Sequence, residues 1–219
     1  MTTSDTERPG RSSRQGPGDR PRVVLIGGTS HAGKSSLARA LAERLGFKAL
    51  STDQLARHPG RPWRRGEPVP PHVVEHYSTL APDALIQSVM RHYDGMWSMV
   101  RELILARAAE AGARGLVLEG SALLPWRVAA LEPAGVAALW LTADEALLET
   151  RMQAESRYAE ADAEGRALIG AFLERTRRYQ RLTIEAVARL GLPRLEVHAG
   201  EPIDVVAERA LRLIGLDQD

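Results

Sequence analysis

"LIGGTSHAGKSSLARAL", residues 25–41, is the stretch that decides the fold of this chain. It opens with apolar residues that favour a buried strand, passes through glycines, and continues in a helical pattern. Gly28, Gly33, Lys34 and Ser35 match the Walker A template G-x-x-x-x-G-K-[ST] in full. A strand before the glycines and a helix after them are the context that this phosphate-binding loop requires, so we expect the stretch to hold a nucleoside triphosphate.

The chemistry of such a loop assigns a role to each of its parts. Backbone N–H groups and the start of the following helix surround the β-phosphate. Lys34 bridges β- and γ-phosphate oxygens, and Ser35 is a ligand of Mg²⁺. Only Lys34 and Lys48 are lysines among the 29 lysine and arginine residues, so a lysine at this position is informative. We therefore expect ATP and Mg²⁺ as cofactors. The predicted loop residues are Gly28, Thr29, Ser30, His31, Ala32, Gly33, Lys34, Ser35 and Ser36.

The composition is that of one globular domain. The chain has 219 residues, of which 44% are apolar and 26% charged. A net charge of +1 gives no reason to expect nucleic acid or an anionic membrane as a partner. There are no cysteines, which excludes disulfides and thiolate metal sites. Without an apolar run long enough for a signal peptide or a membrane span, we expect a cytoplasmic protein.

Strand and helix patterns alternate after a polar tail. Residues 1–20 are rich in Gly, Pro, Ser and Arg and are predicted to be disordered, leaving residues 21–219 as one domain. A Pro-, Arg- and His-rich stretch runs from 57 to 72. Short strands between helices are typical of a parallel sheet covered on both faces. Strands are predicted at 22–28, 48–53, 115–120, 136–143 and 193–199, and helices at 34–45, 83–111 (with a break near Gly95), 144–158, 166–190 and 203–214.

Two acidic residues lie at predicted strand ends, where ligands collect in an open α/β sheet. Asp53 could accept a proton from an attacking hydroxyl or hold Mg²⁺ through water; alternatively, it caps the next helix. Glu119 occupies a Walker-B-like position that polarises water on Mg²⁺; alternatively, it is a strand-terminal acid that faces solvent. Gly120 would let substrate approach closely.

Arginines in the second half of the chain could neutralise charge during phosphoryl transfer. The charged segment 154–165 is predicted to be a lid that closes over the phosphates. The favoured arginines are Arg151, Arg157 and Arg175, with Arg157 in a catalytic role beside Lys34 and Asp53. The alternative interpretation is that these arginines lie on solvated helix faces.

The segment 57–77 combines arginines with aromatic residues directly after Asp53. Arg57 and Arg61 could bind an anionic group of an acceptor, and aromatic side chains a flat one. A surface loop is the alternative. Tyr93 either packs in the core with Trp97 or contacts the acceptor. The residues predicted to bind substrate are Asp53, Arg57, Arg61, Tyr93 and Glu119.

The motif "GGTSHAGKSS", an acid ending the second strand, and an arginine-bearing lid followed by "RTRRYQ" resemble the P-loop kinases of the nucleoside-monophosphate-kinase-like superfamily. The small-molecule members, such as chloramphenicol phosphotransferase, shikimate and gluconate kinases and 2-phosphoglycerate kinase, are the most similar. The resemblance implies a three-layer α/β P-loop NTPase fold with five parallel strands in order 2-3-1-4-5, helices on both faces and a mobile lid. It also implies that Asp53 faces the acceptor hydroxyl and that the turn at 198–202 contacts adenine.

The favoured function is an ATP-dependent kinase that transfers the γ-phosphate to a hydroxyl of a metabolite or an antibiotic-like acceptor. A nucleotide or nucleoside kinase is one alternative, and an ATP-dependent switch or ATPase acting with a protein partner is an alternative of another class. The predicted partner is a small hydroxylated molecule, with no nucleic acid and no membrane; a homodimer is allowed.

Overall fold

The computed structural model describes most of the chain. The tail predicted for residues 1–20 lies outside the described part except for Arg20, and so does Arg57. Among the residues placed by the structure, no helix is both long enough and apolar enough to cross a bilayer. The described residues are 20–55, 60–64, 67–110, 112–131 and 134–217.

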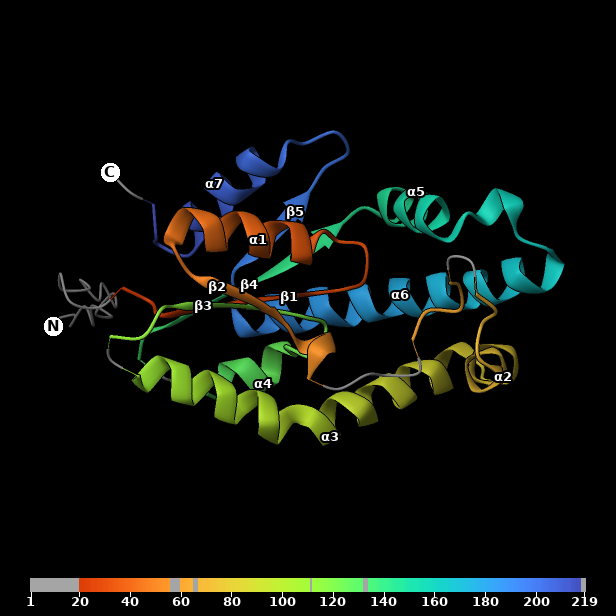
Figure 1. The fold of residues 1–219 in the computed structure, drawn as a ribbon, viewed down its shortest axis with the longest axis horizontal. Helices are drawn as coiled ribbons and strands as arrows, with labels where there is room; N and C mark the ends of the chain where they lie inside the picture. The colour runs from red at the N-terminus through yellow and green to blue at the C-terminus, as the bar shows by residue number, and fades with distance from the viewer. Residues whose placement is uncertain (1–19, 56–59, 65–66, 111, 132–133, 218–219) are drawn as a thin grey trace, which may run out of the picture.

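A five-stranded sheet forms the middle layer (Figure 1). Its order is β2-β3-β1-β4-β5, and every neighbouring pair is parallel, so the predicted topology is confirmed. Residues of β1 pair with β3 on one side and β4 on the other, which places the strand that feeds the P-loop at the centre. The strands are β1 (Val23–Gly28), β2 (Lys48–Ser51), β3 (Leu116–Glu119), β4 (Val136–Ala143) and β5 (Arg194–Val197).

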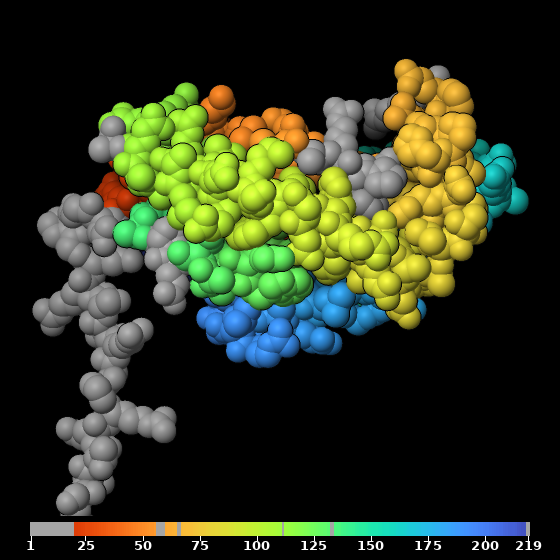
Figure 2. Space-filling view, turned by 90° about the horizontal axis from the view of Figure 1, so that it is seen from below, coloured from red at the N-terminus to blue at the C-terminus, as the bar shows by residue number. Residues whose placement is uncertain are grey.

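The two faces of the sheet are buried under different helices, because successive strand residues point to opposite sides. Val24 and Ile26 belong to the core beneath α1 (Lys34–Leu45) and α7 (Ile203–Leu213). Val23 and Leu25 belong to the core on the other side, which is covered by three helices. Figures 1 and 2 show α3 lying across that face with α4 beside it. The covering helices are α3 (Pro82–Ala109), α4 (Pro125–Ala129) and α6 (Ala163–Leu190).

The long helix α3 is uninterrupted, so the predicted break near Gly95 is wrong. Five apolar residues bury one side of the helix along its length, including Met96 directly after the glycine. An interior glycine costs a helix only about 1 kcal/mol relative to alanine, and this packing outweighs that cost.

Helix α2 (Pro71–Thr79), which was not predicted, begins inside the Pro-, Arg- and His-rich stretch. Pro71 stands at the first helical position, where its missing N–H costs nothing. Val73 and Tyr77, one turn apart, are buried in a cluster with Phe172 of α6. The helix therefore depends on a tertiary contact with a residue nearly one hundred positions away, which sequence spacing does not reveal.

The segment predicted as a lid, 154–165, is mostly helical. Helix α5 (Glu145–Ser156) ends at Arg157, whose φ of 54° is left-handed. A short 3-10 turn, Tyr158–Glu160, follows. Asp162 then caps α6 by accepting a hydrogen bond from the N–H of Gly165 at 2.7 Å. The connection outside α-helices is thus limited to residues 157–162, because a left-handed C-cap and an Asp N-cap extend helical order from both sides.

Candidate active site

The P-loop connects β1 to α1 at the carboxyl edge of the sheet. Gly28 (φ 123°) and Gly33 (φ 103°) both adopt backbone conformations that favour glycine. A Cβ at Gly28 would collide with the carbonyl of Leu141 in β4. The loop is tied down at Thr29, whose buried hydroxyl donates to the carbonyl of Thr176 in α6 at 3.2 Å. The two glycines of the motif are therefore required by the path of the backbone.

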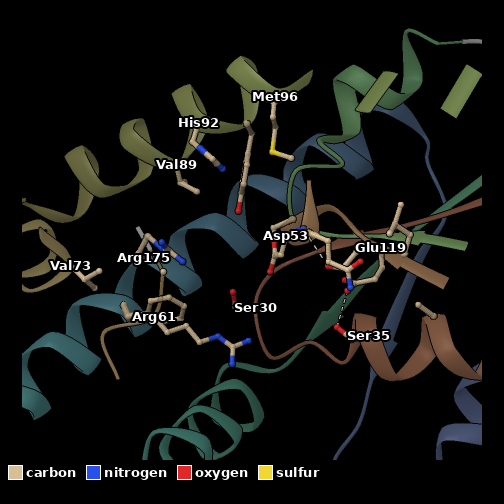
Figure 3. A pocket seen from close by; sticks show the side chains of 18 of the residues that line it. Ser30, Ser35, Asp53, Arg61, Val73, Val89, His92, Met96, Glu119 and Arg175 are labelled. Atoms are coloured by element: carbon tan, nitrogen blue, oxygen red, sulfur yellow. Dashed lines mark hydrogen bonds between the residues drawn. The ribbon is translucent and has the colours of Figure 1, made fainter. Parts of the chain in front are cut away.

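Lys34 and Ser35 lie where the motif predicts. The Nζ of Lys34 is buried and donates to the carbonyl of Thr29 at 2.7 Å. Burial lowers the pKa of Lys34, and the nearby carboxylates of Glu119 and Asp53 oppose this effect. The Oγ of Ser35 donates to Oε1 of Glu119 at 2.9 Å (Figure 3). The loop thus places one ammonium group and one hydroxyl–carboxylate pair at the same point.

The hydroxyl–carboxylate pair fits Mg²⁺. This ion prefers oxygen ligands and commonly uses one or two protein groups together with water and phosphate oxygens. Ser35 and Glu119 supply two such oxygens within hydrogen-bonding distance of each other. Over the described ranges there is no cluster of three or more His, Asp or Glu side chains suited to hold a metal by themselves. The donor set therefore suits an ion shared with a phosphate ligand.

A cavity of about 500 Å³ extends over the P-loop. Residues 30–36 line it at one end together with Arg151, whose Nη1 donates to the carbonyl of His31 at 2.9 Å. Val197, Glu201 and Ile203 also contribute to its wall. The turn expected to contact adenine, 198–202, thus borders the same space through Glu201. We call this space the nucleotide cavity.

A second cavity, of about 790 Å³, lies between the P-loop and helix α3. Figure 3 shows Val89, His92 and Met96 projecting from α3 along one wall, with Arg175 on the side away from Glu119. We call this space the acceptor cavity. It shares seven lining residues with the nucleotide cavity, so the two spaces are continuous. The shared residues are Ser30, Ser35, Ser51, Asp53, Arg61, Glu119 and Ser121.

Asp53 lies at this junction, and its carboxylate is not used for capping. It belongs to a 3-10 turn, Thr52–Gln54, whose N-cap is Ser51: the Ser51 hydroxyl accepts from the N–H of Asp53 at 3.3 Å. The expectation that Asp53 caps this helix is therefore wrong. Gly120 packs against Thr52, where a Cβ would collide with the threonine side chain. The glycine is thus required by the close approach of β3 to the Asp53 turn. Gly120 also lines the nucleotide cavity, so its expected role in the approach of a ligand stays a prediction.

Glu119 is 6% exposed, which contradicts the alternative of a strand-terminal acid facing solvent. The buried carboxylate lies near Lys34 of the P-loop, and Glu119 lines both cavities.

The three predicted arginines occupy three different places. Arg151 lines the nucleotide cavity as expected. Arg157 lines neither cavity; its exposed side chain pairs with Glu160 at 3.4 Å, so the structure does not bring it to the site. Arg175 lines the acceptor cavity and not the nucleotide cavity. It was expected beside the nucleotide, but its position on α6 directs it to Tyr77 of α2.

The predicted substrate residues Arg61 and Tyr93 both reach the acceptor cavity. Arg61 forms an ion pair with Glu155, and its Cζ lies 5.8 Å from the centre of the Trp63 ring. Tyr93 also packs against Tyr179, with ring centres 6.1 Å apart, so its packing role is confirmed. Its contact with an acceptor stays a prediction. Trp97 packs in the core beneath α3 and does not line the cavity.

Several residues that line the acceptor cavity were missed in the sequence, and three of them show why. Phe172, His92 and Ser121 line the acceptor cavity, and each comes from a different element. No short motif connects them, because they meet only through the packing of α6 and α3 on the sheet. An amphipathic pattern predicts that a residue such as Phe172 is buried, but it does not tell whether the residue lines a cavity.

Comparisons with known proteins support the architecture. No protein-family model and no curated protein sequence matches the chain. Among solved structures, a sugar kinase from Janibacter sp. is similar with a TM-score of 0.52 and 19% identity, covering 90% of this chain and 95% of that one. Shikimate kinase from Acinetobacter baumannii is similar with a TM-score of 0.51 and 15% identity, covering 91% and 96%. Deoxyadenosine kinase from M. mycoides is similar with a TM-score of 0.50 and 14% identity, covering 88% and 98%. With its Walker A loop and its 2-3-1-4-5 sheet, the chain therefore has the same three-layer P-loop fold as these solved kinases.

Proposed function

We propose that the protein is an ATP-dependent kinase that transfers the γ-phosphate to a hydroxyl group of a small molecule. The observation that carries this proposal is the continuity of the two cavities at Asp53. The P-loop lines the nucleotide cavity. The acceptor cavity has the volume of a small-molecule site. The acceptor and the γ-phosphate would meet at the residues that line both.

The reaction assigns a task to each of these residues. The acceptor oxygen forms a bond to the γ-phosphorus, and the bond from that phosphorus to the oxygen shared with the β-phosphate breaks. Asp53 accepts the proton that the hydroxyl loses. Lys34 and Arg151 offset negative charge on the phosphate oxygens. Mg²⁺, held by Ser35 and Glu119, supplies further charge neutralisation when bound.

The acceptor cavity favours a kinase over an ATPase that acts through a protein partner. Hydrolysis requires only room for a water molecule next to the γ-phosphate. A cavity of about 790 Å³ that opens directly onto Asp53 exceeds that need by a wide margin. Its apolar wall on α3 and its arginines on the opposite side are typical of a site that orients an organic molecule.

The experiment is a screen for ADP formation with Mg²⁺, ATP and a panel of hydroxylated metabolites and antibiotics. An acceptor should raise ADP formation above the rate with water alone and should appear as a phosphate ester in mass spectra. Lys34→Ala should abolish transfer. The matched control is Lys48→Ala, which removes the other lysine of the chain at an exposed position on β2 and should keep the wild-type rate. Equal rates in the wild type and Lys34→Ala would contradict the proposal.

A further inference from the structure

Arg175 is a buried cation at the far end of the acceptor cavity. Its residue surface is 8% exposed, and it lines the cavity from helix α6. One guanidinium nitrogen, Nη1, donates to the hydroxyl of Tyr77 at 2.8 Å. The Cζ atom lies 4.3 Å from the centre of the Phe172 ring. The side chain is therefore held in place by the Phe172 ring and by one hydrogen bond to an uncharged hydroxyl.

Arg175 has no acidic partner in the described part of the chain. The hydrogen bond to Tyr77 is the only one it makes there, and no carboxylate forms an ion pair with it. Three other arginines of the same helix are paired with acids: Arg177 with Glu145 and Glu149, and Arg178 and Arg181 with Glu174. A buried guanidinium without a counter-ion is costly, because its lost hydration is not replaced. This arrangement is the one expected of a group that awaits an anionic ligand.

A second guanidinium, that of Arg61, lies nearer to the junction with the nucleotide cavity. Arg61 lines the same cavity. Burial lowers the pKa of Arg61, the carboxylate of Asp53 opposes that effect, and the charge of Arg175 lowers it further. The two cations therefore interact unfavourably with each other. Because Arg61 already has an acidic partner in Glu155, Arg175 is the one of the two that lacks an anion.

The acidic residues lie at the opposite end of the cavity. Asp53 and Glu119 are the acids among its lining residues, and both belong to the junction with the nucleotide cavity. In Figure 3 Arg175 lies across the cavity from Glu119 and Ser35, with Val89 and Met96 on the α3 wall between the two ends. The cavity is thus polarised: acids where the phosphate would be transferred, an apolar middle, and the guanidinium group of Arg175 at the far end.

We propose that the acceptor carries, in addition to the hydroxyl that is phosphorylated, a separate anionic group that binds Arg175. This inference rests on the proposed kinase function and names its substrate class: a hydroxylated organic anion with an apolar body. The anionic group is a carboxylate or a phosphate, both of which a guanidinium binds with charge-assisted hydrogen bonds. The hydroxyl points to Asp53, and the apolar body contacts Val89, Met96 and Phe172.

The inference can be tested by ligand binding without knowledge of the acceptor. The protein is first saturated with Mg²⁺ and the non-hydrolysable analogue AMP-PNP, so that the P-loop cannot bind added anions. Benzoate, phenyl phosphate and the uncharged control benzamide are then titrated separately. Binding is followed by the indole N–H resonance of Trp63, whose ring centre lies 5.0 Å from that of Phe172. The resonance is assigned with Trp63→Phe.

We expect benzoate or phenyl phosphate to shift this resonance and benzamide to bind at least about tenfold more weakly, the loss that follows when a charge-assisted hydrogen bond is removed. The anion that binds more tightly identifies the preferred group. Arg175→Gln should weaken binding of that anion at least about tenfold. Arg181→Gln, an exposed arginine of the same helix that lines neither cavity, should leave it unchanged.

Three results would overturn the inference while leaving the kinase proposal intact: AMP-PNP binds but neither anion binds up to about 10 mM, benzamide binds as well as the anions, or Arg175→Gln binds them like the wild type. If AMP-PNP itself does not bind, both proposals fail. Should Arg175→Gln not fold, the comparison of benzoate with benzamide on the wild type decides.

Discussion

The imidazole Nε2 of His31 lies 3.0 Å from a carboxylate oxygen of Glu155, linking the P-loop to the end of helix α5. His31 adopts a left-handed backbone conformation (φ 65°), and its side chain is 4% exposed. Burial, followed by the positive charges of Arg61, Lys34 and Arg151, lowers the pKa of His31 to about 4. The imidazole is therefore neutral at pH 7, and its contact with Glu155 is not an ion pair at that pH.

This pKa predicts a specific loss of stability in acid. Between pH 6.5, the ordinary pKa of histidine, and about 4, the unfolded chain binds a proton at His31 that the folded chain does not. The free energy of unfolding therefore falls as the pH decreases through this range, by at most about 2–3 kcal/mol from this residue. Above pH 6.5 the contribution is absent, and below about 4 it is constant.

Urea unfolding of the wild type and His31→Gln at several pH values between 7 and 4 measures this effect. The difference between the two proteins should change by about 2–3 kcal/mol over the range, with the wild type losing more stability. His198→Gln, at an exposed histidine, serves as control and should follow the wild type. A difference between the wild type and His31→Gln that does not depend on pH would show that His31 does not titrate as the structure implies.

The contact between Ser35 and Glu119 predicts how the protein depends on Mg²⁺. Glu119→Gln keeps an oxygen that can accept from Ser35 but removes the negative charge that attracts the ion. The Mg²⁺ concentration needed for half-maximal ADP formation should rise about tenfold or more. Glu43→Gln, at an exposed position on α1, should not change it. An unchanged Mg²⁺ requirement in Glu119→Gln would remove Glu119 from the metal site.

Gly120 provides a test of how the Asp53 turn is positioned. Alanine there would place its Cβ against Thr52 at a φ of 156°, so either the turn or strand β3 must shift. We expect Gly120→Ala to lower the free energy of unfolding by about 1–3 kcal/mol. Gly170→Ala is the matched control: it lies on an exposed face of α6 with no atom near the added Cβ, and it should be neutral or stabilising by up to about 1 kcal/mol. Urea unfolding of both variants distinguishes the two cases.

Local sequence patterns predicted the sheet and the P-loop because they depend on neighbouring residues. The apolar run 23–26 could only be a buried strand, and the spacing from Gly28 to Lys34 defines the loop whatever surrounds it. The ends of the parallel strands then placed Asp53 and Glu119 at one edge of the sheet. These predictions required no knowledge of tertiary contacts.

The acceptor cavity could not be predicted in this way. Helix α2 forms because Tyr77 packs on Phe172, and Arg175 faces the acceptor cavity because Tyr77 accepts its hydrogen bond. The sequence alone presents Arg175 as one of many arginines, and it stands directly after an acid, Glu174. Its burial, and its lack of an acidic partner among the residues that the structure describes, arise only when α2, α3 and α6 come together.

Asp53→Asn tests the chemical step directly. The amide has the size of the carboxylate but cannot accept a proton from the acceptor, and Asp53 lies at the junction of the two cavities. We expect kcat to fall about 100-fold or more, in line with the usual contribution of a general base. The KM for ATP should change little, since the P-loop amides and Lys34 remain in place.

The measurement is steady-state ADP formation with an acceptor from the screen, together with AMP-PNP binding. Asp204→Asn, at an exposed acid in the first turn of α7, controls for the loss of one negative charge. If Asp53→Asn kept the wild-type kcat, another group would have to take the proton, and Glu119, which lines the same junction, would be the next residue to replace.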